Sequence, residues 1–517
     1  MAAPAGEHTG PSAVEYTVVI PTVMRTSLDE LLRSIDGADG PAPEEIIVVV
    51  DGPYPGEPGY TPQCAPLTLA RSGGRGPAAA RNIGWRKAAT PWVVFLDDDV
   101  RVTGGWCSAL HSDLAEAGAA GAAGTQARIV VPRPAGRKPT DAERGTIGLE
   151  TARWITADMA YRTDVLAAVD GFDEAFPRAY REDADVGLRI SRTHRIIAGR
   201  RRTVHPVQPA GPLASVRAQR GNRDDAVMRR KHGRHWRAAI GEGPGLMHRH
   251  LAAVVLGGAG LLTASSRTPR AAAAAGAGWL AITAWFAAQR MALGPPSIRE
   301  WTRMAVTSAL IPPAAVAHRL AGEYGARTRG PDRRRNRVSA VLFDRDDTLI
   351  VDVPYLGDPD GVRPASGVYE ALAALRADSV LLGVVSNQSG VGRGMITRAQ
   401  AEAVNRRVDE LLGPFDTWQI CYHRPDSECG CRKPRPGLVR QAARELGVPV
   451  DSCVMIGDIL DDVRAAEAAG ARGILVPTPR TRPVEARQVA TADLARSLVD
   501  AAAQAMRRPR AAQPGVA

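Results

Sequence analysis

The chain has 517 residues, which is too long for one ordinary domain and predicts about three. Hydrophobic residues make up 44% and charged residues 23%, a globular composition that excludes a wholly disordered chain. The formal net charge is +11, which favours anionic partners such as phosphorylated small molecules or a membrane surface.

Residues 1–13 lack the basic start and apolar run of a secretory signal, so we expect a disordered leader. The cysteines are not spread as in a disulfide framework, because three of the six lie between residues 421 and 431. A reducing compartment fits this pattern, and we expect a cytoplasmic protein.

Three short apolar runs follow, at residues 16–20, 45–50 and 92–96. Each stops at a polar or acidic turn, and material with helical spacing lies between them. This alternation predicts a Rossmann-like α/β domain over residues 14–235.

The turns of this domain carry four ordered motifs: Val19-Ile20-Pro21-Thr22 with Arg25, Val50-Asp51-Gly52, the segment 76–84, and Asp97-Asp98-Asp99. In this order they resemble the family-2 inverting glycosyltransferases. The resemblance implies that Asp51 contacts the base of a nucleotide sugar and that Arg81 lines the nucleotide site. It also implies that Asp97 and Asp99 bind Mg²⁺ or Mn²⁺ at the donor diphosphate.

Further motifs, at residues 171–174 and 181–189, resemble the acceptor side of the same family. An inverting transfer needs a base for the acceptor hydroxyl, which would belong to a glycan or a lipid-linked molecule. We choose Asp183 as this base, with Glu182 as second choice. His205 stands where such enzymes often place a metal-binding histidine, although a structural role is the alternative.

Apolar stretches at residues 251–265 and 271–288, and a weaker one at 304–317 broken by Pro312-Pro313, distinguish residues 236–325. They could form a hairpin entering a membrane, helices lying in its interface, or buried helices that pack the two catalytic modules together. Flanking basic residues favour the inner face of the cell membrane, whereas Arg267 and Arg270 at the tip count against a hairpin. Residues 326–337 are Arg-rich and predict a linker.

A buried strand at residues 341–343 runs into Asp344 and Asp346. Later strands end at Ser386-Asn387 and at Asp458, and Lys433 lies between them in the sequence. These motifs resemble the haloacid dehalogenase phosphatases, over residues 338–490. The resemblance implies Asp344 as nucleophile, Asp346 as general acid/base, and Ser386, Asn387 and Lys433 as phosphate-binding groups. It also implies Mg²⁺ held by Asp344, Asp458 and the carbonyl of Asp346.

Between these motifs lies a compact Cys and His array whose members are Cys421, His423, Cys429 and Cys431. This set matches a closed structural Zn²⁺ site. With the zinc loop, the module resembles the histidinol-phosphatase-like subgroup, and within it the heptose 1,7-bisphosphate phosphatases. Few residues separate the first two motifs, so we expect an open pocket in which Arg393 and Arg432 grip a second anionic group.

The fold class expected is α/β, with two Rossmann-like domains joined by an Ala-rich helical, apolar segment. Residues 491–517 should form a C-terminal helix, beginning near Val489 and ending near Met506, and a tail. We therefore expect a bifunctional enzyme that acts on a nucleotide sugar and a sugar phosphate, and no nucleic-acid partner. The alternative is a phosphatase for another sugar phosphate or histidinol phosphate, with the first module as a binding or scaffolding domain.

Overall fold

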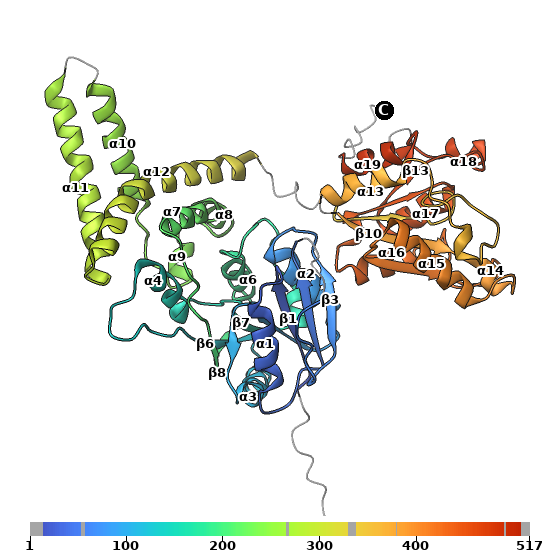
Figure 1. The fold of residues 1–517 in the computed structure, drawn as a ribbon, viewed down its shortest axis with the longest axis horizontal. Coiled ribbons are helices and arrows are strands. Elements are labelled where there is room, and N and C mark those ends of the chain that lie inside the picture. The colour runs from blue at the N-terminus through green and yellow to red at the C-terminus, as the bar shows by residue number, and fades with distance from the viewer. Residues whose placement is uncertain are drawn as a thin grey trace, which may run out of the picture.

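The computed structural model describes residues 14–52, 57–264, 268–328, 338–378, 380–490 and 493–507. It contains two α/β domains with a helical region between them in the chain (Figure 1). The expected leader at 1–13, residues 329–337 of the expected linker, and the tail from 508 lie outside the described residues.

The first sheet has eight strands in the order β3-β2-β1-β4-β7-β6-β8-β5. Its buried half contains the three strands expected from apolar runs, and these pair in parallel with one another and with β3. The strands of this half are β1 Tyr16–Thr22, β2 Glu45–Val50, β3 Leu67–Arg71 and β4 Trp92–Leu96. Strands β1, β2 and β4 are buried on both faces, which explains why their sequences are almost continuously apolar, whereas the edge strand β3 is half-buried.

The other half of this sheet corrects the Rossmann-like prediction, because β7 runs antiparallel to both β4 and β6. The sheet is therefore mixed. Its strands are β5 Arg101–Val102, β6 Gly124–Val130, β7 Asp158–Arg162 and β8 Ile196–Val204. In β6 and β8 buried and exposed positions alternate, so polar residues interrupt the apolar pattern that would have revealed these strands.

Helices cover both faces of the first sheet, and further helices of this domain lead into the middle region of the chain (Figure 1). Those used below are α2 Pro77–Lys87, α4 Asp141–Ile147, the 3-10 helix η1 Gly148–Thr151, α6 Glu182–Ile190 and α8 Asn222–His232. The others are α1 Ser27–Asp36, α3 Trp106–Ala119, α5 Thr163–Ala168, α7 Ala214–Arg217, η2 Ala218–Gly221 and α9 Trp236–Ala239.

The middle region consists of α10 Met247–Ala264, α11 Pro269–Leu293 and α12 Ile298–Thr328. Helices α10 and α11 pack on each other and project away from both sheets (Figure 1). The interpretation that they pack the two catalytic modules together is therefore wrong. The prediction of a break at Pro312-Pro313 is also wrong, since α12 continues through both prolines. This helix packs on α8 and α10.

The second sheet is wholly parallel, in the order β11-β10-β9-β12-β13. Its strands are β9 Ala340–Phe343, β10 Leu381–Asn387, β11 Thr417–Cys421, β12 Cys453–Gly457 and β13 Arg472–Leu475. The short strand β11 has half-buried positions and was not recognised from the sequence.

Helices of this domain are α13 Val368–Ala377, α14 Ser389–Gly392, α15 Arg398–Leu412, α16 Gly437–Glu445, α17 Leu460–Ala469, α18 Pro483–Ala486 and α19 Leu498–Met506. Two 3-10 turns accompany them, η4 Pro359–Gly361 and η5 Val450–Ser452. The last helix begins at Leu498 and not near Val489. The Ser497 hydroxyl caps its first turn, and Leu494 forms an isolated β-bridge with Leu475, so the chain before Ser497 is not helical.

Candidate active sites

The carboxyl ends of β9, β10 and β12 bring chemical groups to one edge of the second sheet. Asp344 follows β9, Ser386 is the second-last residue of β10, and Asp458 follows β12. All three side chains are buried. In an open parallel sheet this edge is where ligands bind, so the topology alone assembles a candidate site.

Lys433 lies at the centre of this site, fully enclosed by acceptors. Its Nζ is 2.8 Å from Asp344 Oδ1 and 2.6 Å from Asp462 Oδ1, and it donates to the Val385 carbonyl at 2.8 Å. Burial alone would lower the pKa of Lys433, but the two carboxylates raise it well above its usual range. The ammonium is therefore a permanent positive charge beside Asp344.

Three carboxylates cluster around this single lysine, with oxygens of Asp344, Asp458 and Asp462 within 4.8 Å of one another. Burial and the neighbouring carboxylates raise the pKa of Asp344 to about 6, although Lys433 opposes this, and they raise the pKa of Asp458 to about 8. This excess of negative charge is what a divalent cation offsets, so the oxygen donors fit Mg²⁺. Asp462 also belongs to this cluster, in addition to Asp344 and Asp458, which were expected there.

Asp346 points into the same edge and is held by two donors that the sequence did not reveal. Arg345 forms a bidentate pair with it, at 3.0 and 3.1 Å, and the Gln388 amide donates to it at 2.6 Å. The buried Arg345 also donates to Asn405 at 2.8 Å. These bonds fix the orientation of the Asp346 carboxylate.

The remaining predicted phosphate-binding residues each have their own hydrogen-bonding situation. Asn387 exchanges hydrogen bonds with the main chain of Lys433, each of 3.1 Å. Gln388 donates to the Ser386 hydroxyl at 2.9 Å. Arg393 donates to the Tyr355 hydroxyl at 3.0 Å. A buried nitrogen of Arg432, Nη1, has no hydrogen-bond partner within the described part of the chain, which leaves a donor for a ligand.

Asp347, which directly follows Asp346 in the sequence, has two further features. It adopts the left-handed conformation with φ 52°, which Asp tolerates better than most residues. Arg480, which the sequence reading missed, forms ion pairs with Asp347 and Asp352 from the loop after β13. No sequence motif marked this arginine, because its partners lie far away in the chain.

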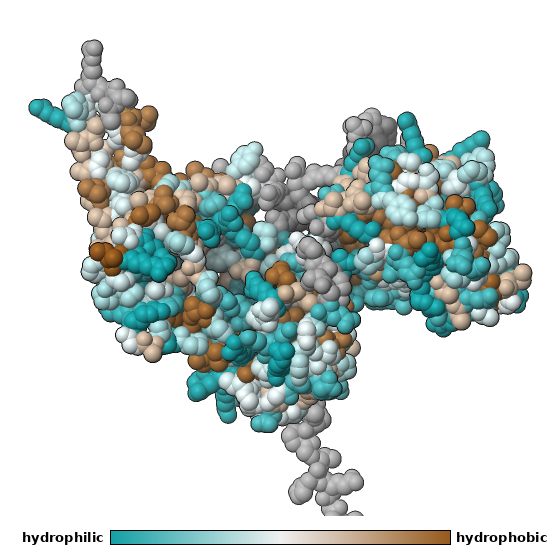
Figure 2. Space-filling model, in the orientation of Figure 1, coloured by the Kyte–Doolittle hydropathy of each residue, from teal (hydrophilic) through white to brown (hydrophobic). Residues whose placement is uncertain are grey.

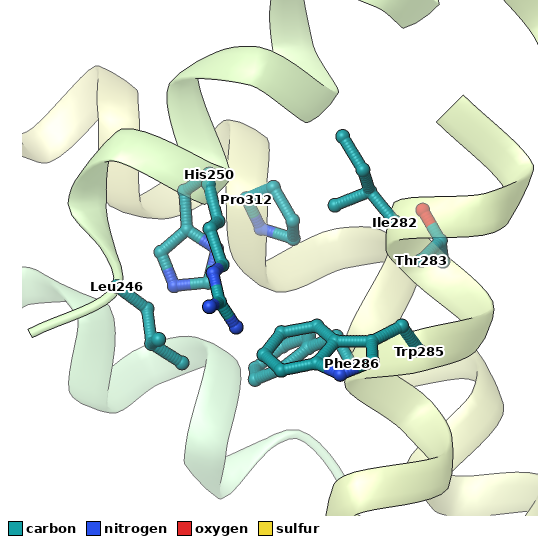
Figure 3. Close-up of a pocket in the computed structure, with 8 residues that line it drawn as sticks. Leu246, His250, Ile282, Thr283, Trp285, Phe286 and Pro312 are labelled. Atoms are coloured by element: carbon teal, nitrogen blue, oxygen red, sulfur yellow. The ribbon is translucent and has the colours of Figure 1, made fainter. Parts of the chain in front are cut away.

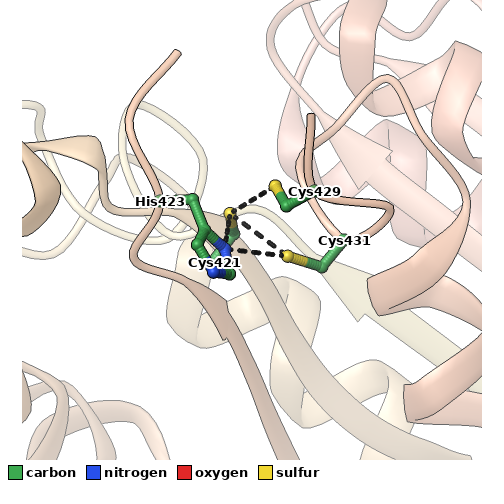
Figure 4. A group of neighbouring side chains, drawn as sticks. All are labelled: Cys421, His423, Cys429 and Cys431. Carbon is green, nitrogen blue, oxygen red and sulfur yellow. Dashed lines mark hydrogen bonds between the residues drawn. The ribbon is translucent and has the colours of Figure 1, made fainter. Parts of the chain in front are cut away.

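The Cys and His array converges beside this site, at the end of β11 (Figure 4). The sulfurs of Cys421 and Cys429 are 3.8 Å apart, those of Cys421 and Cys431 3.5 Å, and His423 Nδ1 lies 3.2 Å from the Cys431 sulfur. A tetrahedral site with Zn–S bonds of about 2.3 Å has edges of about 3.8 Å. The four donors therefore have the spacing of a closed zinc site. Burial and the neighbouring sulfurs raise the pKa of Cys431 to about 12 in the absence of a cation.

The first domain has a separate pocket of about 760 Å³ at the carboxyl ends of β1 and β4. Asp97, Asp99 and His205 face one another in it, and His205 Nε2 lies 3.6 Å from Asp99 Oδ1. The middle residue, Asp98, turns inward, where Thr22 donates to it at 2.7 Å and Arg25 at 3.1 Å. Because Asp98 points inward, the carboxylates of Asp97 and Asp99 and the imidazole of His205 remain in the pocket, and these ligands fit Mg²⁺ or Mn²⁺.

Arg81, which comes from α2, links the two acidic motifs of this pocket. Its guanidinium donates to Asp97 at 2.7 Å and to Glu182 at 2.8 Å. Burial raises the pKa of Glu182 to about 8, with Asp183 adding to the effect and Arg81 opposing it. Asp51 also lines the pocket and accepts hydrogen bonds from the Ser72 hydroxyl and the Gly76 amide, at 2.5 and 3.0 Å.

Asp183 lies in the first turn of α6 and lines the same pocket as Asp97. Burial raises its pKa, and the Ala184 amide donates to it at 2.6 Å. The turn is fixed by Arg181, which has φ 78°, donates to Asp225 at 3.0 Å, and pairs with Glu242. Glu242, which also lines the pocket, was not recognised from the sequence, since it lies within the Gly-rich segment 241–245.

Each of the two domains matches a model of a known family. The glycosyl transferase family 2 model matches residues 17–184, and the HAD-hydrolase-like model matches residues 430–501. A D-glycero-beta-D-manno-heptose-1,7-bisphosphate 7-phosphatase from Yersinia pestis is 35% identical over 167 residues, which are 30% of this chain and 88% of that protein. The chain belongs to the family-2 glycosyltransferases through its first domain and to the haloacid dehalogenase phosphatases through its second.

Other relatives of the phosphatase domain cover the same part of the chain. The enzyme of the same name from Escherichia coli K12 is 34% identical over 165 residues, 30% of this chain and 86% of that protein. A structure of D,D-heptose 1.7-bisphosphate phosphatase from B. bronchiseptica, complexed with magnesium and phosphate, is 28% identical and covers 32% of this chain and 97% of that one, with a TM-score of 0.29.

For the glycosyltransferase domain, a structure of S. aureus TarS 1-349 in complex with UDP is 18% identical. It covers 61% of this chain and 92% of that one, with a TM-score of 0.29.

Proposed function

We propose that the phosphatase domain hydrolyses the 7-phosphate of D-glycero-D-manno-heptose 1,7-bisphosphate. The observation that carries the proposal is the buried Asp344, Lys433 and Asp458 constellation at the sheet edge. The curated relatives with this activity, about a third identical over most of their own length, support the choice of substrate.

In this proposal Asp344 attacks phosphorus and forms an aspartyl-phosphate, while Asp346 gives a proton to the leaving sugar alkoxide. Asp346 then accepts a proton from the water that hydrolyses the intermediate. Lys433, the Ser386 hydroxyl and Asn387 stabilise the phosphoryl oxygens. Arg345 and Gln388 keep Asp346 aimed at the leaving oxygen.

Mg²⁺ would be held by Asp344, Asp458 and the carbonyl of Asp346, and when bound it offsets charge on the phosphoryl group. We propose a structural role for zinc at Cys421, His423, Cys429 and Cys431, where it would pin the loop that leads into Arg432 and Lys433.

Arg432 and Arg393 are proposed to bind the second phosphate of the substrate, at the anomeric position. The unpartnered Nη1 of Arg432 supports this assignment, since a buried guanidinium nitrogen without an acceptor is costly. Within the described residues, only η4 and α13 lie between β9 and β10, which leaves the pocket open to a sugar bisphosphate.

For the first domain we propose transfer of a sugar from a nucleotide donor to a glycan or lipid-linked acceptor. Asp51 and Arg81 would contact the nucleotide, and Asp97, Asp99 and His205 would hold Mg²⁺ or Mn²⁺. Asp183, which lines the same pocket as Asp97, would remove the acceptor proton. Burial raises the pKa of Asp183, and a raised pKa makes its carboxylate a stronger base.

The test of the phosphatase proposal is phosphate release by the full chain on heptose 1,7-bisphosphate, histidinol phosphate and hexose phosphates. We expect the heptose bisphosphate to have the highest kcat/KM, and Asp344→Asn to abolish turnover. Preference for histidinol phosphate or another sugar phosphate would replace the proposed substrate by the alternative one.

The test of the transferase proposal is calorimetric binding of uridine diphosphate with and without Mn²⁺. Metal-dependent binding that is lost in Asp99→Asn supports an active donor site. No binding of any nucleotide would favour the alternative, in which this domain serves as a scaffold.

A further inference from the structure

Helices α10 and α11 form a projection, here called the arm, whose apolar side chains face outward. Leu261 and Leu262 near its tip are 79% and 76% exposed, and Leu280 is 59% exposed. Figure 2 shows brown, apolar surface along the arm, where it extends beyond the rest of the molecule. An exposed apolar surface of this extent on one projection is typical of an interaction site.

The charged residues of this segment are all basic. The sequence contains no Asp or Glu between Gly243 and Arg299, whereas Arg249, Arg270 and Arg290 lie in the two helices. A surface that is apolar along its length and cationic at both ends complements a bilayer with anionic headgroups.

The two helices of the arm contact each other through small residues. A side chain at Gly257 would meet the Trp279 ring at 3.0 Å, and one at Gly278 would meet Leu256 at 3.1 Å. Gly260 lies opposite the main chain of Gly276. Small residues that let helix backbones approach closely are the packing used between helices in lipid, where apolar side chains gain nothing by facing inward.

The base of the arm is built differently, from aromatic and basic side chains (Figure 3). The Arg249 guanidinium lies 4.1 Å from the centre of the Trp285 ring, and His250 packs edge-on against Phe286 at 5.3 Å. Aromatic rings paired with cations are typical of the level at which a helix leaves the hydrocarbon and meets the headgroups.

Arg290 fastens this base to the glycosyltransferase domain. Its buried guanidinium donates to Asp141 of α4 at 2.6 Å and to Thr307 and Ser308 of α12 at 2.8 and 2.9 Å. Helix α4 leads directly into η1, which lines the glycosyltransferase pocket. The arm is thus a rigid extension of that domain.

The dimensions fit a bilayer. At 1.5 Å per residue, α10 from Arg249 to Ala264 spans about 24 Å and α11 from Pro269 to Trp285 about 26 Å, against a hydrocarbon thickness of about 30 Å. Helix α11 is long and apolar enough to cross a membrane, with only 11% of its most apolar window buried. We propose that the arm inserts tip-first into a bilayer containing anionic lipid, with Arg249 and Trp285 at the headgroups.

Flotation of the full chain with vesicles tests the proposal. Vesicles of phosphatidylcholine with about 30% phosphatidylglycerol should carry the protein to the top of a density gradient, also in 1 M salt. Replacing two exposed leucines, in Leu261→Glu/Leu280→Glu, should reduce the bound fraction by more than about tenfold. The matched control is Val484→Glu in the phosphatase domain, an apolar residue whose 55% exposure is close to the 59% of Leu280, and this variant should float unchanged.

A second measurement does not depend on the glutamate variants folding. Lipids brominated in their acyl chains should quench the tryptophan fluorescence of the bound protein, and Trp279→Phe should reduce this quenching. Failure of the unaltered chain to float, or unchanged flotation of the double variant, would overturn the proposal. So would a dimer in lipid-free solution that the double variant abolishes, since the occupant of the arm would then be a second copy.

Discussion

Lys433→Met should destabilise the phosphatase domain severely, because it removes the only cation between two buried carboxylates. Lys433 Nζ lies 2.8 Å from Asp344 and 2.6 Å from Asp462, and the side chain is 1% exposed. Breaking a buried pair by removing one partner costs about 3–5 kcal/mol. A domain has about 5–15 kcal/mol in total, so the variant loses between about a fifth and all of its stability.

Native-state hydrogen exchange measures this loss separately for each domain. Amides of β9 and β12, which open by global unfolding of the phosphatase domain, should exchange about 100-fold faster or more in Lys433→Met. Amides of β1 and β2 in the glycosyltransferase domain are the internal control and should not change. The double variant Lys433→Met/Asp462→Asn should recover about half of the loss, because only Asp344 is then left unpaired. Unchanged exchange of β9 and β12 in Lys433→Met would refute the reasoning.

Four further outcomes follow from the two sites. The unaltered chain should contain about one zinc by mass spectrometry, and Cys431→Ser should lose it together with several degrees of thermal stability; equal zinc content in both would contradict a four-ligand site. Arg345→Met should lower the kcat of phosphate release about 10–100-fold with little change in KM, since Arg345 orients Asp346 and touches no substrate; a change confined to KM would contradict this role. Asp99→Asn should weaken Mn²⁺-dependent binding of uridine diphosphate more than tenfold in calorimetry, whereas the exposed Asp164→Asn should not. Asp183→Asn should abolish sugar transfer and leave nucleotide binding intact; loss of both would place Asp183 in the donor site instead.

Strands buried on both faces could be predicted from the sequence, because burial makes them continuous apolar runs. The carboxyl ends of β9, β10 and β12 then place Asp344, Ser386 and Asp458 together by topology alone. The Cys and His array was also readable, since its four ligands lie within one short loop. Local patterns of this kind can be recognised in a single sequence.

Features that depend on distant partners could not be predicted. Strand β7 runs antiparallel to both of its neighbours. Strand β8, on the far side of β6, is interrupted by arginines, one of which, Arg201, pairs with Asp113 and Asp158 inside the domain. Glu242 and Arg480 reach their pockets from loops without a motif. Pro312 stays inside α12 because neighbouring helices outweigh its local preference.

The most direct test of the phosphatase assignment is ³¹P nuclear magnetic resonance of heptose 1,7-bisphosphate incubated with the full chain and Mg²⁺. The account predicts that the C7 phosphate signal disappears while the C1 phosphate remains, and that Asp344→Asn leaves both signals unchanged. Loss of the C1 phosphate, or hydrolysis by Asp344→Asn, would contradict it.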